Sequence, residues 1–455
     1  MRSRELIVYR NFEAGRAGTL HRMEKLVREC EKTASEKPDS AGGAREDGAE
    51  TFYECIHELI GQAGVYGFHG NLWHCYLTHL LVTHENGYSR GCEMRGEIQG
   101  TINDAVLHDM RIFKEFFDYD FSFLCGRLGV EEFSFAQQYR NGTGEAEVYN
   151  ARICQCICGL AEKLGRAATA EEMKDILTEF YRNYGVGKLG LHKCFRIGRD
   201  ENARVCMEPI PRIAHVKLDD LVGYELQKKK LTDNTEAFLA GRAANNCLLF
   251  GDAGTGKSSS IKAIANAYYD RGLRVIEVYK HQFQDLNEII SQIKGRNYKF
   301  IIFMDDLSFE DFEIEYKYLK AVIEGGLEKK PENVLIYATS NRRHLIRENY
   351  GDKEEIRQDM HTGDTVQEKL SLAHRFGVTI YFGSPDKKQF QGIVKALALR
   401  HGIDMPEEEL LARANQWELS HGGMTGRMAQ QFIDYLRGCG PELHGERRCG
   451  AAKPE

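Results

Sequence analysis

The sequence predicts an α/β protein: a parallel sheet covered by helices, with a largely helical region before it and a small helical domain after it. Three observations lead to this prediction. The chain has 455 residues, enough for two or three domains. Proline is absent between Pro38 and Pro209, as expected where helices dominate. Beyond Pro211, short apolar runs alternate with helical stretches, which is typical of a parallel sheet with helices on both faces.

The proline pair at Pro209 and Pro211 marks the expected boundary, because a Pro-x-Pro segment is extended and ends any helix before it. We therefore predict a mostly helical N-terminal domain over 1–210 and an α/β core over 211–385. A helical lid is expected over 386–437, where strand-like runs stop. The remaining 438–455 have little apolar content and are expected to be a disordered tail.

Within the core, five apolar runs have the length of buried strands. They are Asn246–Phe250, Arg274–Tyr279, Phe300–Met304, Val334–Ala338 and Val378–Phe382. Helical spacing predicts helices between and after them. These are Ser258–Tyr269 and Phe283–Ile293 in the core, and Asp386–Arg400, Pro406–Gln416 and Met424–Leu436 in the lid.

Composition and charge restrict the classes of partner. The net charge is −7, so the chain lacks the basic surplus with which proteins usually grip nucleic acid. No apolar run is long enough to span a membrane, and the N-terminal residues do not resemble a secretory signal, so a cytoplasmic location is expected. The 13 cysteines then fit free thiols better than disulfides. Cys154, Cys156 and Cys158 form a C-x-C-x-C run, which we interpret as small apolar residues on a helix rather than a metal site.

A glycine-rich loop follows the first predicted core strand and precedes a helix. Its pattern is G-x-x-x-x-G-K-S, in which glycines let backbone N–H groups surround phosphates and the helix presents its positive end to them. Lys257 is expected to reach the β- and γ-phosphates of a bound nucleotide, and the Ser258 hydroxyl to ligate Mg²⁺. The predicted phosphate-binding residues are Gly251, Asp252, Ala253, Gly254, Thr255, Gly256, Lys257, Ser258 and Ser259.

Two carboxylates follow the buried run Phe300–Met304. Because ligands bind at the carboxyl edge of an open α/β sheet, Asp305 is expected to hold Mg²⁺. Its neighbour Asp306 is expected to orient and activate the attacking water. One predicted strand lies in sequence between the glycine-rich loop and this pair of carboxylates. Nucleotide kinases usually lack that extra strand.

Three further residues are candidates for sensing phosphate. Asn341 follows the next strand and could hold a water in line with the γ-phosphate, although capping a helix is nearly as good an interpretation. Arg375 precedes the last strand and could reach a neighbouring subunit's γ-phosphate, a role for which Arg342 and Arg343 compete. Arg427 begins a lid helix, where a cation needs an anionic partner such as a phosphate. An ordinary surface salt bridge is the alternative for Arg375 and for Arg427.

These motifs together resemble the AAA+ superfamily, and most closely the bacterial family called domain of unknown function 815. The resemblance is strong over about Arg212–Leu436 and weaker over the N-terminal half. The segments that carry it are Leu218–Glu225, Leu248–Ser258, Asp305–Glu310, Tyr337–Leu345 and His421–Arg427.

The resemblance implies a five-stranded parallel sheet with a helical lid and assembly into rings or open spirals. It also implies that Leu221, Val222 and Gly223 lie near the adenine, and that Arg427 is the phosphate sensor of the lid. One residue departs from the family pattern, because AAA+ proteins usually carry Glu where this chain has Asp306. The shorter carboxylate brings the rate of hydrolysis into question more than nucleotide binding.

The function expected from the sequence is an ATPase that binds ATP with Mg²⁺, works as a homo-oligomer and remodels or moves a protein partner. A nucleotide-dependent switch with little hydrolysis is the main alternative, supported by Asp306. A small-molecule kinase is a weaker alternative, and a nucleic-acid partner is unsupported by the charge.

Overall fold

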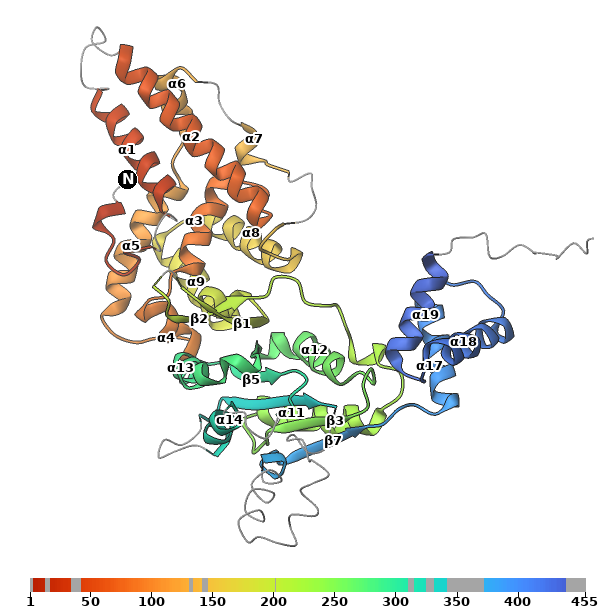
Figure 1. Cartoon of the computed structure of the whole chain (residues 1–455). Coiled ribbons are helices and arrows are strands. Elements are labelled where there is room, and N and C mark those ends of the chain that lie inside the picture. The colour runs from red at the N-terminus through yellow and green to blue at the C-terminus, as the bar shows by residue number, and fades with distance from the viewer. Residues whose placement is uncertain are drawn as a thin grey trace, which may run out of the picture. The chain divides into compact units, whose positions relative to one another are not determined.

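The computed structural model describes residues 3–12, 17–33, 42–130, 134–140, 146–200, 202–309, 315–324, 331–341 and 372–438. The chain forms two compact units (Figure 1). The first comprises Met1–His192 and Pro209–Arg212, and the second comprises Lys193–Glu208 and Ile213–Glu455. Within the described residues, no helix is both long enough and apolar enough to cross a bilayer.

The first unit is built from helices around one apolar core. They are α1 (Gly18–Thr33), α2 (Gly42–Tyr66), α3 (Leu72–Thr83), α4 (Gly87–Arg95), α5 (Ile102–Phe117), α6 (Phe121–Leu128), α7 (Ser134–Gln137), α8 (Ala151–Arg166), α9 (Ala170–Tyr184) and α10 (Gly187–Leu191). Buried Asp109 on α5 accepts hydrogen bonds from the backbone N–H groups of Ile7, Val8 and Tyr9. This carboxylate therefore fixes the segment before α1 to the core.

Helix α3 lies at the centre of this unit. Ten of its twelve residues are buried, so the helix is covered on nearly all sides, as expected of a central helix. It packs against α8, whose buried face includes Cys154 and Cys158. Cys156 is only partly buried, because residues two apart on a helix face different directions.

The second unit contains a seven-stranded sheet in the order β2-β1-β4-β5-β6-β3-β7. Its strands are β1 (Cys194–Arg199), β2 (Val205–Pro209), β3 (Cys247–Gly251), β4 (Leu273–Glu277), β5 (Lys299–Met304), β6 (Val334–Ser340) and β7 (Val378–Phe382). The pairs β1–β4, β4–β5, β5–β6, β6–β3 and β3–β7 are all parallel. All seven residues of β6 are buried, which is the mark of a strand covered on both faces. The remaining core helices are α11 (Glu225–Leu239), α12 (Lys257–Tyr268), α13 (Leu286–Ile293) and α14 (Glu315–Glu324).

The predicted fold class is confirmed: β4, β5, β6, β3 and β7 form the parallel five-stranded part, and a largely helical region precedes it. The sheet also contains β1 and β2, which extend it beyond β4 and which the sequence prediction assigned to the helical domain. The compact units accordingly divide near His192 rather than at the predicted boundary after residue 210. The lack of proline favoured helix over this stretch, but Phe195 and Ile197 alternate with exposed residues as a strand requires.

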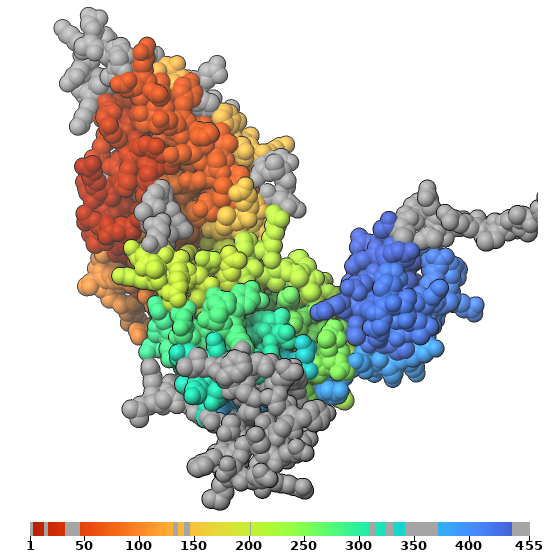
Figure 2. Space-filling model, in the orientation of Figure 1, coloured from red at the N-terminus to blue at the C-terminus, as the bar shows by residue number. Residues whose placement is uncertain are grey.

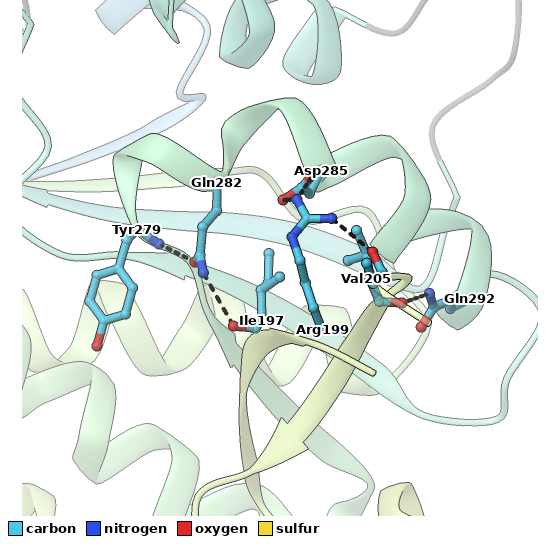
Figure 3. Close-up of polar contacts among 8 residues, drawn as sticks. Ile197, Arg199, Val205, Tyr279, Gln282, Asp285 and Gln292 are labelled. Atoms are coloured by element: carbon cyan, nitrogen blue, oxygen red, sulfur yellow. Dashed lines mark hydrogen bonds and ion pairs between the residues drawn. The ribbon is translucent and has the colours of Figure 1, made fainter. Parts of the chain in front are cut away.

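Side chains attach the added strands to the segment after β4 (Figure 3), which begins with the 3₁₀ helix η5 (Lys280–Asp285). Arg199 on β1 forms an ion pair with Asp285 at 3.2 Å. Gln282 donates to the carbonyl of Ile197, and Gln292 on α13 donates to the carbonyl of Val205. The β1–β2 pair is therefore joined to the sheet unit by side chains as well as by the β1–β4 ladder.

The lid consists of α17 (Lys387–Arg400), α18 (Glu407–His421) and α19 (Gly426–Gly438). These helices surround a small apolar core of their own, in which Phe390, Val394 and Phe432 are buried. Val222, from the segment before α11, also packs against this core. Figure 2 shows the lid as a compact blue body. The predicted tail lies outside the described residues beyond Gly438.

Candidate functional site

The candidate site lies where the strand order of the sheet reverses. The chain leaves β3, crosses to β4, returns through β5 to β6 beside β3, and places β7 on the other side of β3. Crevices at the carboxyl ends of strands are deepest at such a reversal. The loop after β3, the carboxylates after β5 and Asn341 after β6 all lie at this edge.

The glycines of the loop after β3 occupy backbone positions that other residues rarely adopt. Gly251 has φ 131°, and a Cβ there would come within 2.1 Å of the Phe382 carbonyl oxygen. Gly254 has φ 74°, and a Cβ there would lie 3.2 Å from the Cβ of Arg427 in the lid. Gly256, with φ 93°, caps α12. The loop therefore bends tightly between β7 and the lid, as the glycine pattern predicts.

Lys257 is nearly buried, with 6% of its surface exposed. Its ammonium donates to the carbonyl oxygens of Gly251 at 2.8 Å and Asp252 at 2.6 Å, and to the Asn341 amide oxygen at 3.0 Å. Burial lowers the pKa of Lys257, and the carboxylates of Asp252, Asp306 and Asp305 oppose this shift.

Asp305 is held by two hydroxyl groups. Ser258 and Thr339 each donate to the same carboxylate oxygen at 2.6 Å. Thr339 also accepts a hydrogen bond from the backbone N–H of Asp306 at 2.9 Å. The oxygen atoms of Ser258, Asp305 and Thr339 therefore lie close together beside the N-terminus of α12. A hydroxyl and a carboxylate are ligands that Mg²⁺ prefers, and it usually takes its remaining ligands from water and substrate phosphates. The residues present therefore fit this ion.

Asp306 has a backbone φ of 51°, in the left-handed region. This conformation is uncommon for a residue with a side chain, and it turns the chain so that the Asp306 carboxylate accepts from the Asn341 amide at 2.7 Å. The Asn341 side chain thus contacts Lys257 through its oxygen and Asp306 through its nitrogen. The three side chains form one network across the ends of β3, β5 and β6.

Asp252 connects the loop to the segment that leads into the lid. Its carboxylate accepts from the backbone N–H of Ser384 at 2.7 Å and from the Ser384 hydroxyl at 2.8 Å. These hydrogen bonds from Ser384 lower the pKa of Asp252. In addition, the backbone N–H of Arg427 donates to the Gly254 carbonyl at 3.2 Å. The loop therefore contacts both the lid and the segment that leads into it.

A pocket of about 760 Å³ opens between the loop and the lid. Most of the residues predicted from the sequence line it: Leu221, Val222, Ala253, Gly254, Thr255, Gly256, Lys257, Ser258, Ser259, Asp305, Asp306, Asn341 and Arg427. Gly223 lies between two lining residues, while Gly251 and Asp252 contact Lys257 through their carbonyls.

Arg375 is not brought into this pocket. It lies just before β7, whose start pairs with the start of β3, whereas the glycine-rich loop follows the end of β3. At ~3.3 Å per residue the strand alone separates Arg375 from the loop by roughly 15 Å. The competing Arg342 and Arg343 lie outside the described residues.

The structure adds four side chains that the sequence reasoning did not select. Thr339 was passed over for Asn341, although its place at the end of an apolar run was a usable signal. Ser384 anchors Asp252. Asp220 and Arg400 form an ion pair at 3.0 Å and both line the pocket. No local pattern links two residues so far apart in the chain, so this pair could not have been found from spacing.

The family comparison covers the part of the chain that holds this site. The model of the family described as "Protein of unknown function (DUF815)" matches residues 191–439, more than half of the chain. The chain belongs to this family. The matched residues of the DUF815 chain include all seven strands, the site and the lid.

Among solved structures, the DUF815 chain is similar to the Thermotoga maritima RuvB Holliday junction branch migration motor, with 17% identity and a TM-score of 0.37. That match covers 52% of this chain and 68% of RuvB. It is also similar to the FIGL-1 AAA domain in complex with ADP, with 17% identity and a TM-score of 0.34. That match covers 51% of this chain and 80% of the other. A search of curated proteins found no match.

Proposed function

We propose that this protein binds ATP with Mg²⁺ in the pocket between the glycine-rich loop and the lid, and hydrolyses it. The observation that carries the proposal is the network in which Lys257, Asn341 and Asp306 meet beside the Ser258–Asp305 pair. A buried ammonium, paired carboxylates and a helix N-terminus at one sheet edge are what phosphoryl transfer to water requires.

Each side chain has a distinct proposed role. Backbone N–H groups of residues 253–258 and the Lys257 ammonium would hold the phosphates, after Lys257 gives up its carbonyl partners. Ser258 and Asp305 would hold Mg²⁺, which supplies charge neutralisation for the phosphate oxygens. Asp306 would accept a proton from the attacking water, and Asn341 would orient both the Asp306 carboxylate and that water. Arg427 would contact phosphate from the lid, and Leu221, Val222 and Gly223 would lie by the base.

We further propose that the enzyme is a homo-oligomer whose sites are completed by a second copy. The position of Arg375 supports this, because it lies at the opposite end of β7 from the loop and so is too far from the pocket of its own chain. An arginine supplied by a neighbour would stabilise the charge that develops on the phosphates. The work done on a protein partner is the proposed outcome of this cycle.

The test is ATP turnover per chain as a function of protein concentration, with Lys257→Ala beside it. Lys388→Ala, an exposed lysine on α17, is the matched control. We expect turnover that rises steeply with concentration, is abolished in Lys257→Ala and is unchanged in Lys388→Ala. Turnover that persists in Lys257→Ala would contradict the proposal.

A switch with little hydrolysis is the second candidate, and one observation favours it. The Asp306 side chain is one carbon shorter than glutamate and already accepts from Asn341 at 2.7 Å, so it reaches less far toward an attacking water. Comparison of Asp306→Asn with Asp306→Glu separates the two functions. Hydrolysis by Asp306 predicts that Asn lowers kcat by roughly 100-fold or more while ATP still binds. Tight binding with negligible turnover in the unmodified chain would favour the switch.

A further inference from the structure

Two buried thiols face each other in the helical unit, which does not include the residues of the proposed ATPase site. Cys75 on α3 and Cys158 on α8 have exposed fractions of 1% and 5%. Their sulfur atoms are 3.8 Å apart, where α3 packs against α8. The two sulfurs are therefore in contact across the interface between the two helices.

The contacts around the pair make the two thiols chemically different. Cys75 donates to the sulfur of Cys158 and also lies 3.3 Å from the carbonyl oxygen of His69. This hydrogen bond lowers the pKa of Cys158, against the opposing effect of burial. The same contact, together with burial, raises the pKa of Cys75. The first proton is thus lost from Cys158, which becomes the nucleophilic thiolate, with Cys75 held against it as a thiol.

A pocket lies beside His69, the residue whose carbonyl oxygen contacts Cys75. His69 is exposed and lines a pocket of about 550 Å³, together with Gly67, Cys154 and Gln155. Cys154 is one helical turn before Cys158, but its sulfur contacts the Tyr66 carbonyl at 2.9 Å. The neighbouring thiol is therefore engaged with the backbone, whereas Cys158 is engaged with a second thiol.

We propose that Cys75 and Cys158 are a modification site at which a hydroperoxide converts two thiols into a disulfide between α3 and α8. In the first step the Cys158 thiolate attacks the peroxide oxygen, the O–O bond breaks, and the released hydroxide takes a proton to form water. Cys158 is then a sulfenic acid. In the second step the Cys75 sulfur attacks the Cys158 sulfur, the S–O bond breaks, and a second water leaves with the Cys75 proton. Two thiols and one hydrogen peroxide thus give one disulfide and two waters, and a dithiol reductant reverses the modification.

The experiment uses the full chain, reduced and then treated with a small molar excess of hydrogen peroxide. Remaining thiols are alkylated under denaturing conditions, and the digest is analysed by mass spectrometry. We expect a cross-linked peptide pair that contains Cys75 and Cys158, lost on treatment with dithiothreitol. In Cys75→Ser, we expect a sulfenic acid at Cys158 that dimedone traps. In Cys158→Ser, Cys75 should remain alkylatable.

Cys55→Ser is the matched control. Cys55 is fully buried in the same unit, and burial raises its pKa to about 11. We expect the cross-link in this variant at the unmodified yield. Cys75→Ala and Cys158→Ala, each checked by circular dichroism, replace the serine variants if serine prevents folding. Absence of the cross-link in the unmodified chain would overturn the proposal. So would oxidation of Cys75 in the Cys158 variants at the unmodified rate.

Discussion

At the scale of single residues, Thr339 has the most unusual position in the proposed site. Its hydroxyl donates to the Asp305 carboxylate and accepts from the Asp306 backbone. It therefore connects the proposed metal ligand to the left-handed turn that directs the proposed base. Only 1% of the Thr339 surface is exposed, so neither hydrogen bond is exchanged with bulk water.

Thr339→Val is expected to remove both hydrogen bonds while keeping the shape of the side chain. A typical intramolecular hydrogen bond contributes about 1 kcal/mol, so the loss of two should lower the free energy of unfolding by about 2 kcal/mol. If Asp306 acts as proposed, kcat should also fall by roughly tenfold or more, with KM little changed. Urea unfolding and steady-state kinetics measure the two effects.

Thr339→Ser is the matched variant, since it keeps the hydroxyl and loses a methyl group. We expect it to retain most of the turnover and to lose about 1 kcal/mol of stability. Equal loss of kcat in the Val and Ser variants would show that packing, rather than the hydroxyl, matters.

At the scale of elements, the hydrogen bonds between Asp252 and Ser384 join the glycine-rich loop to the segment that enters the lid. Because they lower the pKa of Asp252 in the folded chain, Asp252 stabilises the fold when it is ionised in both the folded and unfolded states. That stabilisation is complete well above the ordinary Asp pKa of 3.8 and is lost as the pH falls through the lower folded value.

Ser384→Ala removes one of these hydrogen bonds. We expect the variant to be less stable than the unmodified chain at neutral pH, and the difference to shrink as the pH falls below about 3.8. Urea unfolding of both proteins at a series of pH values measures it. A difference that does not change with pH would mean that the Ser384 hydroxyl stabilises the fold without acting on the ionised carboxylate.

The elements differ in how far sequence could predict them. The run Val378–Phe382 was predicted at the bounds that β7 has, because an apolar run between turn residues has a clear length. The added strand β1 was missed, because Gly198 and two arginines interrupt its apolar pattern and its position next to β4 depends on pairing between distant segments. Local patterns indicate elements, whereas long-range pairing decides which elements join a sheet.

The same distinction applies to the candidate site. The loop residues and Asp305 carry a pattern whose spacing reflects the chemistry, so they could be selected in advance. The contact of Asn341 with both Lys257 and Asp306 depends on three strands lying side by side, and it is visible only in the fold. The Asp220–Arg400 ion pair depends on the docking of the lid.

At the scale of the whole molecule, the proposed oligomer predicts that two inactive variants can restore each other's turnover, which a site formed by one chain could not do. Arg375→Ala and Lys257→Ala should each lose turnover, the first with ATP binding retained. When the two variants are mixed, chains with an intact Lys257 site should receive Arg375 from the Lys257→Ala copies. We therefore expect the mixture to recover a fraction of the turnover.

The control for this mixture is Arg437→Ala, an exposed arginine on α19 that pairs with Asp434. It should have unmodified turnover alone. A mixture of Arg375→Ala and Lys257→Ala that stays inactive, although light scattering shows mixed assemblies, would contradict a shared site. Melting temperatures close to that of the unmodified chain would exclude a folding defect in either variant.

The path of the chain through β1 and β2 has a practical consequence. The second of these strands ends at Pro209, the first proline of the pair, yet both strands belong to the sheet whose other strands follow the pair. A shortened protein that starts at Pro211 would therefore lose both strands, and the backbone edge of β4 would be exposed to pairing with other molecules. One that starts near Lys193 would keep this edge covered. A cut at Ile210 in the intact protein should leave β1 hydrogen-bonded to β4, so the two fragments should migrate together until a denaturant separates them.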